Sequence, residues 1–266
     1  MLKQRIITAL ILAVVLLVIL FVLPVEVAVG VFAVLMLLGA WEWAALSGVH
    51  AVASRAAFTV AVAAAMGALA LYVPPGGIPV ALLWVQLALW AVAAALLVRF
   101  PRPIPGLLSA PAGLAVLSLA WLGLAFLLTN ESLGPAWVLF LFVIVACADV
   151  GAFAAGKLFG RVKLAPRVSP GKTWEGLIGG LAAVSVGAAV GAWWFELPTG
   201  ALVGLCLAVA GISVVGDLSV SMLKRNAGLK DSGSLFPGHG GVLDRVDSLL
   251  AATPLFVLGL KWLAQV

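Results

Sequence analysis

Acidic, basic and glycine residues are concentrated in one stretch late in the sequence, KDSGSLFPGHGGVLDRVDS, residues 230–248. Asp244 and Asp247 are three positions apart, so a helix would place both carboxylates on one face. Mg²⁺ prefers hard oxygen ligands and often links carboxylates to substrate phosphates. Gly240 and Gly241 would let the backbone approach a ligand closely. This stretch therefore predicts a site for metal-bound phosphates.

A second group of candidates lies within apolar segments. Asp149 and Asp217 interrupt such segments, where a charge at the bilayer centre costs about 2.5–3.5 kcal/mol, so each should face a partner or a watery cavity. The residues Asp217, Ser221, Lys224 and Arg225 have the spacing of one helix face. That face suits a ligand carrying phosphates. Two alternatives stay open: an aspartate paired with a lysine for packing alone, and two cations snorkelling at a helix end.

A second polar stretch carries the triplet Gly171, Lys172 and Thr173. The triplet is similar to the end of a P-loop, but Pro166 stands where that motif requires its first glycine, and no strand is predicted before it, so the P-loop is excluded. The triplet leads into a predicted helix whose free N–H groups and dipole favour an anion. Ser169 or Thr173 would cap that helix, and Lys172 adds a cation.

The elements that must position these residues are apolar helices. The sequence is 65% hydrophobic and only 9% charged, whereas soluble domains carry about 25% charged residues. This composition excludes a soluble protein and predicts an all-α, polytopic membrane protein with about nine spans, each near the length of about 20 residues that a bilayer requires. The predicted spans are 5–23, 25–46, 56–73, 78–98, 108–128, 135–159, 174–195, 199–223 and 247–265.

The distribution of basic residues predicts the orientation of the spans. With a cytoplasmic N-terminus and an outer C-terminus, fourteen of the fifteen Lys and Arg residues fall on the inner side, all except Lys261. The net charge of +5 therefore reflects topology, and no nucleic acid is expected as a partner. The sequence divides into packing and lipid-access helices in residues 1–134 and a catalytic region in 135–266, with cytoplasmic loops at 160–173 and 224–246.

Glycine pairs at four-residue spacing, among them Gly176/Gly180 and Gly200/Gly204, predict close helix packing. A homodimer through such faces is a further expectation. Cys147 and Cys206 lie in apolar runs, where each is expected to be a small buried side chain rather than part of a disulfide or zinc site. No inverted repeat of the transporter type is evident, which weakens a transporter as an interpretation.

The stretch SVSMLKRNAGLKDSGSLFPGHGGVLDRVD, residues 219–247, resembles the signature of the phosphatidate cytidylyltransferases, and the match runs from Ser221 to Asp247 without a gap. The resemblance implies an enzyme of phospholipid synthesis in the cell inner membrane, with its active site facing the cytoplasm. It also implies the reaction of CTP with phosphatidate to give CDP-diacylglycerol and pyrophosphate, with a dependence on Mg²⁺. The alternatives are another CTP-dependent lipid transferase or kinase, acting on an ether lipid or polyprenol, and, more weakly, a transporter.

In this interpretation the functional residues fall into three sets. The metal ligands, for Mg²⁺ and a potential second cation, are Asp217, Asp244, Asp247 and Asp149, with Asp231 as a further candidate. The phosphates of CTP or phosphatidate are bound by Lys172, Lys224, Arg225, Lys230 and Arg245, with Ser169, Gly171, Thr173, Ser221, Gly240 and Gly241 as further substrate contacts. His239 contacts a phosphate or orders its loop.

Overall fold

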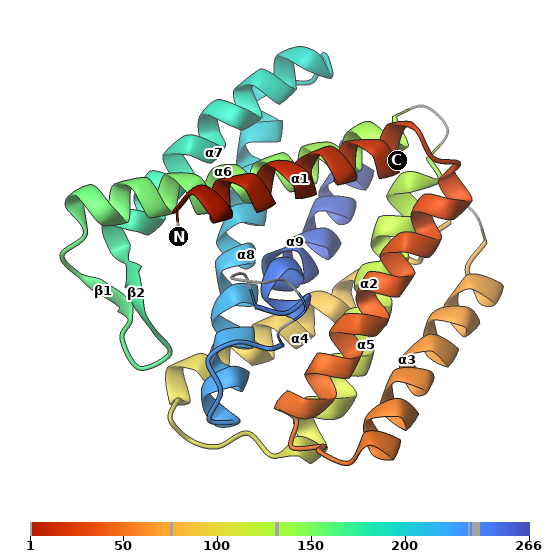
Figure 1. The fold of residues 1–266 in the computed structure, drawn as a ribbon. Helices are drawn as coiled ribbons and strands as arrows, with labels where there is room; N and C mark the ends of the chain where they lie inside the picture. Colours follow the sequence, from red (N-terminus) through yellow and green to blue (C-terminus); the bar gives the residue numbers. More distant parts are fainter. Residues whose placement is uncertain (1, 75–76, 131–132, 234, 236–239) are drawn as a thin grey trace.

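The computed structural model shows nine α-helices and one β-hairpin in the residues that it describes, which are all except 1, 75–76, 131–132, 234 and 236–239 (Figure 1). The side chains of residues 2–9 are also not described. The elements are α1 (Leu2–Phe21), α2 (Val25–Leu46), α3 (Val52–Tyr72), α4 (Val80–Arg99), α5 (Gly106–Leu128), α6 (Gly134–Phe159), β1 (Lys163–Ala165), β2 (Ser169–Thr173), α7 (Trp174–Trp194), α8 (Thr199–Asn226) and α9 (Leu243–Trp262).

Each predicted span coincides with one helix, and prolines mark many of the boundaries. Pro24, Pro79, Pro105 and Pro198 directly precede α2, α4, α5 and α8. A proline fits there because the first residues of a helix have no intrahelical partner for their N–H groups. The predicted loop 224–246 is shorter at both ends, because α8 continues to Asn226 and α9 already begins at Leu243.

Seven of the helices, α2 to α8, are long and apolar enough to cross a membrane. In α1 the segment Leu10–Phe21 is a shorter apolar helix. The protein is thus an all-helical, polytopic membrane protein, apart from the small hairpin.

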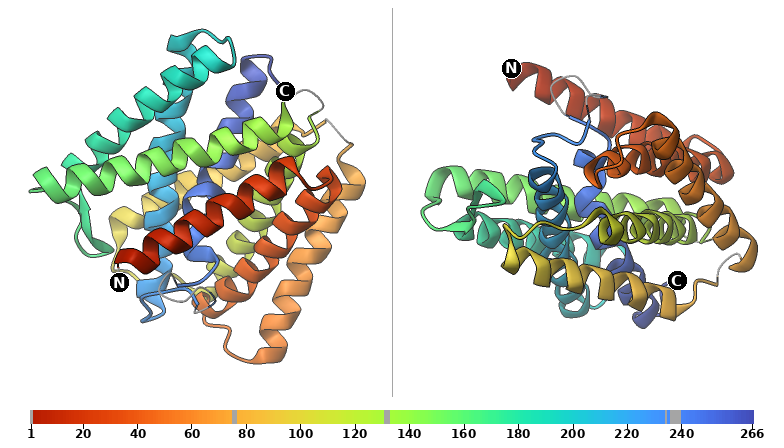
Figure 2. Two further views of the ribbon diagram at one scale, coloured as in Figure 1. Left: turned by 45° about the horizontal axis from the view of Figure 1, so that its top comes forward. Right: turned by 90° about the horizontal axis from the view of Figure 1, so that it is seen from below.

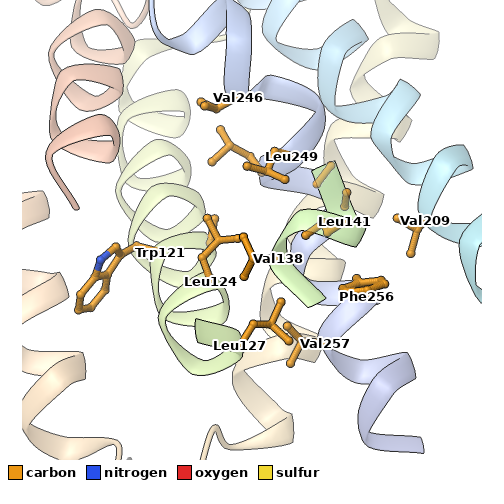
Figure 3. Close-up of a cluster of buried hydrophobic side chains, with 14 of the residues drawn as sticks. Trp121, Leu124, Leu127, Val138, Leu141, Val209, Val246, Leu249, Phe256 and Val257 are labelled. Carbon is orange, nitrogen blue, oxygen red and sulfur yellow. The ribbon is translucent and has the colours of Figure 1, made fainter. Parts of the chain in front are cut away.

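Helix α9 lies at the centre of the bundle, where it contacts α2, α4, α5, α6 and α8. Figure 3 shows its side chains Leu249, Phe256 and Val257 among those of α5 and α6, such as Leu124 and Leu141. Nearly every residue of α9 from Val246 to Leu260 is buried. The polar start of this helix is therefore held in place by an apolar core on several sides.

Helices α6 and α7 pack closely along one side of the molecule (Figure 2). A Cβ added at Gly180 would come within 2.7 Å of the Ala148 carbonyl oxygen, and one at Gly151 would lie equally close to the Gly179 carbonyl oxygen. Only glycine permits this approach, so helix packing explains these residues. In contrast, Gly200 and Gly204 have open space around them.

The segment between α6 and α7 forms a two-stranded antiparallel sheet, in which Lys163 pairs with Thr173 and Ala165 with Ser169. The expectation that no strand precedes the Gly-Lys-Thr triplet is therefore wrong, since β1 precedes it and β2 contains it. Strands of three and five residues are too short to show a hydrophobic period, and Pro170 and Gly171 favour an interpretation as a loop. The P-loop remains excluded, because Pro166 stands at the position of the motif's first glycine. The strands also form an antiparallel hairpin.

Candidate functional site

The predicted face of α8 carries much of the site. The Ser221 hydroxyl donates a hydrogen bond to Oδ1 of Asp217 over 3.2 Å, and Lys224 Nζ lies 2.6 Å from Oδ1 of Asp244 on α9. The spacing of Asp217 and Ser221 in the sequence thus correctly predicted that they lie together on one face of α8. Arg225 departs from it: its side chain is exposed and donates to the carbonyl oxygens of Val168 and Leu229.

The loop between α8 and α9 wraps its backbone around Asp244. Oδ2 of Asp244 accepts hydrogen bonds from the N–H groups of Ser232, at 2.9 Å, and Gly241, at 3.0 Å. Gly240 has φ +78°, a left-handed conformation that favours glycine, and a Cβ there would collide with the Asp244 carboxylate. Gly240 therefore allows a close approach of the backbone to the Asp244 carboxylate, whereas the predicted approach of Gly240 and Gly241 to a ligand stays a prediction.

The hairpin brings the second polar stretch to the same place. Lys172 Nζ lies 2.5 Å from Oδ2 of Asp217, so a cation of β2 is paired with a carboxylate of α8. Oγ1 of Thr173 accepts a hydrogen bond from the Gly176 N–H over 3.1 Å, which makes Thr173 the cap of α7. Of the two predicted caps, Thr173 is confirmed, whereas Ser169 lies in β2.

A pocket of 410 Å³ lies beside this ion pair, between α6, the hairpin, α7 and α8. Its polar lining consists of Asp149, Ser169, Lys172 and Thr173, together with Gly171. The rest of the wall is mainly apolar, formed by residues such as Phe153 and Leu177. The pocket therefore combines two charged side chains, Asp149 and Lys172, with a mainly apolar lining between membrane helices.

Three carboxylates from three helices share this region. Asp149 of α6 and Asp247 of α9 both interact electrostatically with Asp217 of α8, and Lys172 interacts with both Asp149 and Asp247. The Asp247 side chain is buried, and its Oδ1 accepts a hydrogen bond from the Ser248 N–H. Asp149, Asp217 and Asp247 are thus all within electrostatic range of Lys172, whereas Asp244 is paired with Lys224.

The described part of the chain contains no ready-made cluster of three or more His, Cys, Asp or Glu side chains of the kind that holds a metal. Mg²⁺ does not require such a cage, because it commonly binds one or two carboxylates, several waters and substrate phosphates. Both oxygens of Asp244 and both oxygens of Asp217 already have partners, whereas the side chain of Asp149, which lines the pocket, is exposed. The donor set therefore fits an ion shared with phosphates, with Asp149 as its most accessible carboxylate.

Three of the other predicted residues have exposed side chains. Lys230 and Asp231 are exposed at the beginning of the loop after α8. Arg245 is exposed on the first turn of α9, where its charge interacts with Asp149. His239 lies outside the described residues.

One residue of the site escaped the sequence analysis. Glu42 of α2 is buried, and its carboxylate accepts hydrogen bonds from the Ser232 hydroxyl and from the N–H groups of Val242 and Leu243. A carboxylate in an apolar membrane segment is itself a signal of function. The sequence gives no indication of its partner, which lies 190 or more positions away.

These features define a class of protein: an all-helical membrane protein whose lysines and aspartates meet beside an apolar pocket, an arrangement suited to anionic phosphates. The cytidylyltransferase family model matches residues 3–263 of the chain. The chain is 44% identical to a phosphatidate cytidylyltransferase of Pseudomonas aeruginosa over 281 aligned residues, covering 99% of this chain and 98% of the relative.

Two further relatives match over shorter stretches. A phosphatidate cytidylyltransferase of Haemophilus influenzae is 50% identical over 128 residues, which are 45% of this chain and 43% of the relative. One of Brucella suis is 45% identical over 148 residues, which are 55% of each chain. The chain therefore belongs to the cytidylyltransferase family.

Proposed function

We propose that the protein transfers the cytidylyl group of CTP to phosphatidate, giving CDP-diacylglycerol and pyrophosphate. One observation carries this proposal: Lys172, which is paired with Asp217, and Asp149 line a pocket whose remaining walls are mainly apolar and formed largely by membrane helices. A reaction between a polar nucleotide and a lipid phosphate requires such a junction. The names of the relatives, in particular that of Pseudomonas aeruginosa, support the same activity.

The reaction joins two anions. An oxygen of the lipid phosphate attacks the α-phosphorus of CTP, a new P–O bond forms, and the bond to the β-phosphate breaks with its electron pair on the leaving pyrophosphate. The lipid phosphate is already ionised, so no side-chain nucleophile is required. Lys172 and Lys224 supply positive charge that offsets the repulsion and stabilises the leaving group, so that positioning and electrostatics do most of the work.

Mg²⁺ would be held by Asp217, with Asp149, Asp247 and Asp244 as further ligands or as supports. When bound, the ion would neutralise phosphate charge. A second cation remains part of this proposal. The carboxylates also orient their neighbours. Asp217 orients Lys172 and Ser221, and Asp244 orients Lys224 and the loop backbone.

The proposed arrangement in the membrane has nine spans, a cytoplasmic N-terminus and an outer C-terminus, with the site on the cytoplasmic side of the inner membrane. The fourteen basic residues of the inner segments support this orientation. CTP would then arrive from the cytosol and phosphatidate laterally between helices. A homodimer stays a prediction.

The proposal is tested by incubating the purified protein in detergent with labelled CTP, Mg²⁺ and phosphatidate. We expect labelled CDP-diacylglycerol and an equal amount of pyrophosphate. Replacing phosphatidate with an ether-lipid or polyprenyl phosphate, or CTP with ATP or dCTP, separates this activity from that of related lipid enzymes. Product formed only from another lipid, or phosphoryl transfer in place of cytidylyl transfer, would overturn the proposal.

A variant in the same assay tests the role of Asp244. Asp244→Asn removes the charge opposite Lys224, so turnover should fall roughly 100-fold or more while the protein still inserts into membranes. The matched control is Glu26→Gln, which neutralises an exposed carboxylate in the first turn of α2 and should leave turnover unchanged. Near-normal activity of Asp244→Asn would contradict this assignment.

A further inference from the structure

The carboxylate of Glu42 is bound entirely by the loop and helix that carry the site. Oε1 accepts a hydrogen bond from the Val242 N–H over 2.9 Å, and Oε2 accepts from the Leu243 N–H over 2.8 Å and from the Ser232 hydroxyl over 2.7 Å. The Glu42 side chain is only 7% exposed. Among the described residues it forms no ion pair with Lys or Arg, so the N-terminal end of α9 supplies the positive field that it faces.

The end of α2 holds Glu42 firmly. The neighbouring Trp41 accepts hydrogen bonds at its carbonyl oxygen from Arg55 of α3, whose guanidinium also stacks on the Trp41 ring at 4.2 Å from its centroid. On the other side, the Trp43 indole N–H donates to the Ser109 carbonyl oxygen of α5 over 2.8 Å. Three consecutive residues of α2 thus reach three different elements, which fixes the rotation of the helix about its axis.

The loop is shaped to fit this carboxylate. A Cβ added at Gly241 or at Gly233 would collide with the Glu42 carboxylate. Glycine at both positions therefore allows the loop backbone to approach the Glu42 carboxylate, just as Gly240 allows it to approach the Asp244 carboxylate. Two carboxylates, one from α2 and one from α9, are enclosed by the same short loop.

Glu42 and Asp244 also share their partners. Ser232 donates its hydroxyl to Glu42 and its backbone N–H to Asp244, and Gly241, which donates to Asp244, directly precedes Val242, which donates to Glu42. Any displacement of the loop from Glu42 would therefore be passed to the backbone that orients Asp244 and, through it, Lys224.

We propose that Glu42 is a positioning residue for cytidylyl transfer, which holds Ser232 and the start of α9 at Val242 and Leu243 so that Asp244 and Lys224 face the phosphates. This inference rests on the proposed function. Glu42 does not contact the substrate itself; it acts through Ser232, Val242 and Leu243. The site is thereby completed by a helix from the first half of the chain.

The test is Glu42→Gln, with Glu26→Gln on the same helix as the matched control. The amide has one acceptor oxygen in place of two, and its NH₂ group would face an N–H donor of the loop. We expect kcat to fall on the order of 100-fold, the effect of a small misplacement of reacting groups, with a smaller change in KM for CTP. The control should retain the wild-type kcat.

Hydrogen exchange of the backbone amides at Val242 and Leu243 gives a readout that does not depend on activity. Exchange should be faster in Glu42→Gln and unchanged in Glu26→Gln. If the wild-type protein makes no CDP-lipid, the proposed function fails. The exchange measurement still tests whether Glu42 holds the Val242 and Leu243 amides. If the wild-type protein is active and Glu42→Gln keeps its kcat or its slow exchange, the positioning role is overturned.

Ser232→Ala removes one of the three donors and provides a milder variant, should Glu42→Gln fold poorly. Its kcat should fall less than that of Glu42→Gln, and the double variant should lose little more than Glu42→Gln alone, because residues that act through one contact are not additive. Fully additive losses, or a lowered Tm with an unchanged kcat for Ser232→Ala, would indicate a purely structural role and overturn the inference.

Discussion

The two lysine–aspartate pairs of the site differ in burial. The side chains of Lys224 and Asp244 are 11% and 8% exposed, whereas those of Lys172 and Asp217 are 27% and 26% exposed. A pair removed from water loses much when one partner is deleted, because the remaining charge is left uncompensated. A pair that water reaches loses little, since solvent screens its attraction. Deleting one partner of the Lys224–Asp244 pair should therefore lower stability, whereas deleting one partner of the Lys172–Asp217 pair should affect mainly function.

This difference gives a prediction for two matched variants. Lys224→Met should destabilise the protein by about 3–5 kcal/mol, and Lys172→Met by no more than about 1 kcal/mol, while both lose most of their turnover. Thermal unfolding in detergent gives the first comparison and the CTP assay the second. Combining Lys224→Met with Asp244→Asn should recover part of the lost Tm. Equal Tm values for the two single variants would contradict the assignment.

At the scale of single residues, the sequence predicted which side chains lie close together when these belong to one helix or one short stretch. The helical spacing from Asp217 to Lys224 placed these side chains on one face of α8, because a helix converts spacing into a common face. The joint role of Asp244 and Asp247 as metal ligands stays a prediction. Glu42 could not be assigned in this way. Its partners lie on a distant segment, and a carboxylate in an apolar helix shows that a partner is needed without showing which.

At the scale of elements, α6 and α7 form the rigid wall behind the hairpin. Their contact depends on glycines whose neighbours are backbone atoms of the opposite helix, so the two helices cannot separate without losing dispersion contacts along their length. The hairpin and the capped start of α7 are attached to this wall. Lys172 thus extends from a rigid support toward Asp217 of α8. The sequence did not predict this arrangement, because the two strands are too short to show a hydrophobic period.

Two glycines provide a prediction for this packing. Gly180→Ala would place a Cβ within 2.7 Å of the Ala148 carbonyl oxygen and should destabilise the protein by about 1–3 kcal/mol. Gly204→Ala has nothing within 4 Å of the new methyl group, so it should be neutral or stabilise α8 by up to about 1 kcal/mol. Thermal unfolding of both variants tests the contrast. A lower Tm for Gly204→Ala than for Gly180→Ala would show that the contacts of these helices are different.

At the scale of the whole molecule, the sequence predicted the order and bounds of the helices well, because long apolar runs separated by Pro and Gly leave few alternatives. The division into two halves at residue 134 stays a prediction. Contacts nevertheless cross it: Asn226 of α8 exchanges hydrogen bonds with the backbone N–H and C=O of Ile104 before α5, and Gln86 of α4 donates to the Leu250 carbonyl oxygen. Composition could not reveal these contacts, since they join single polar groups across apolar surfaces.

The membrane orientation can be measured with single cysteines in a chain that lacks Cys147 and Cys206. An odd number of spans places the two ends on opposite sides. Gln265→Cys and Glu196→Cys should react with a membrane-impermeant thiol reagent from the outer side, and Leu229→Cys only from the cytoplasmic side in inverted vesicles. Labelling of Leu229→Cys and Glu196→Cys from the same side would contradict the proposed topology.

The central position of α9 has a consequence for how the protein is made. This helix follows the other eight in the chain. The ribosome therefore synthesises the central helix after the helices that surround it. Until then α2, α4, α5, α6 and α8 lack the contacts that α9 supplies at the centre of the bundle, and Glu42 lacks the Val242 and Leu243 donors. Insertion of α9 therefore completes the core of the bundle and the binding of Glu42 together.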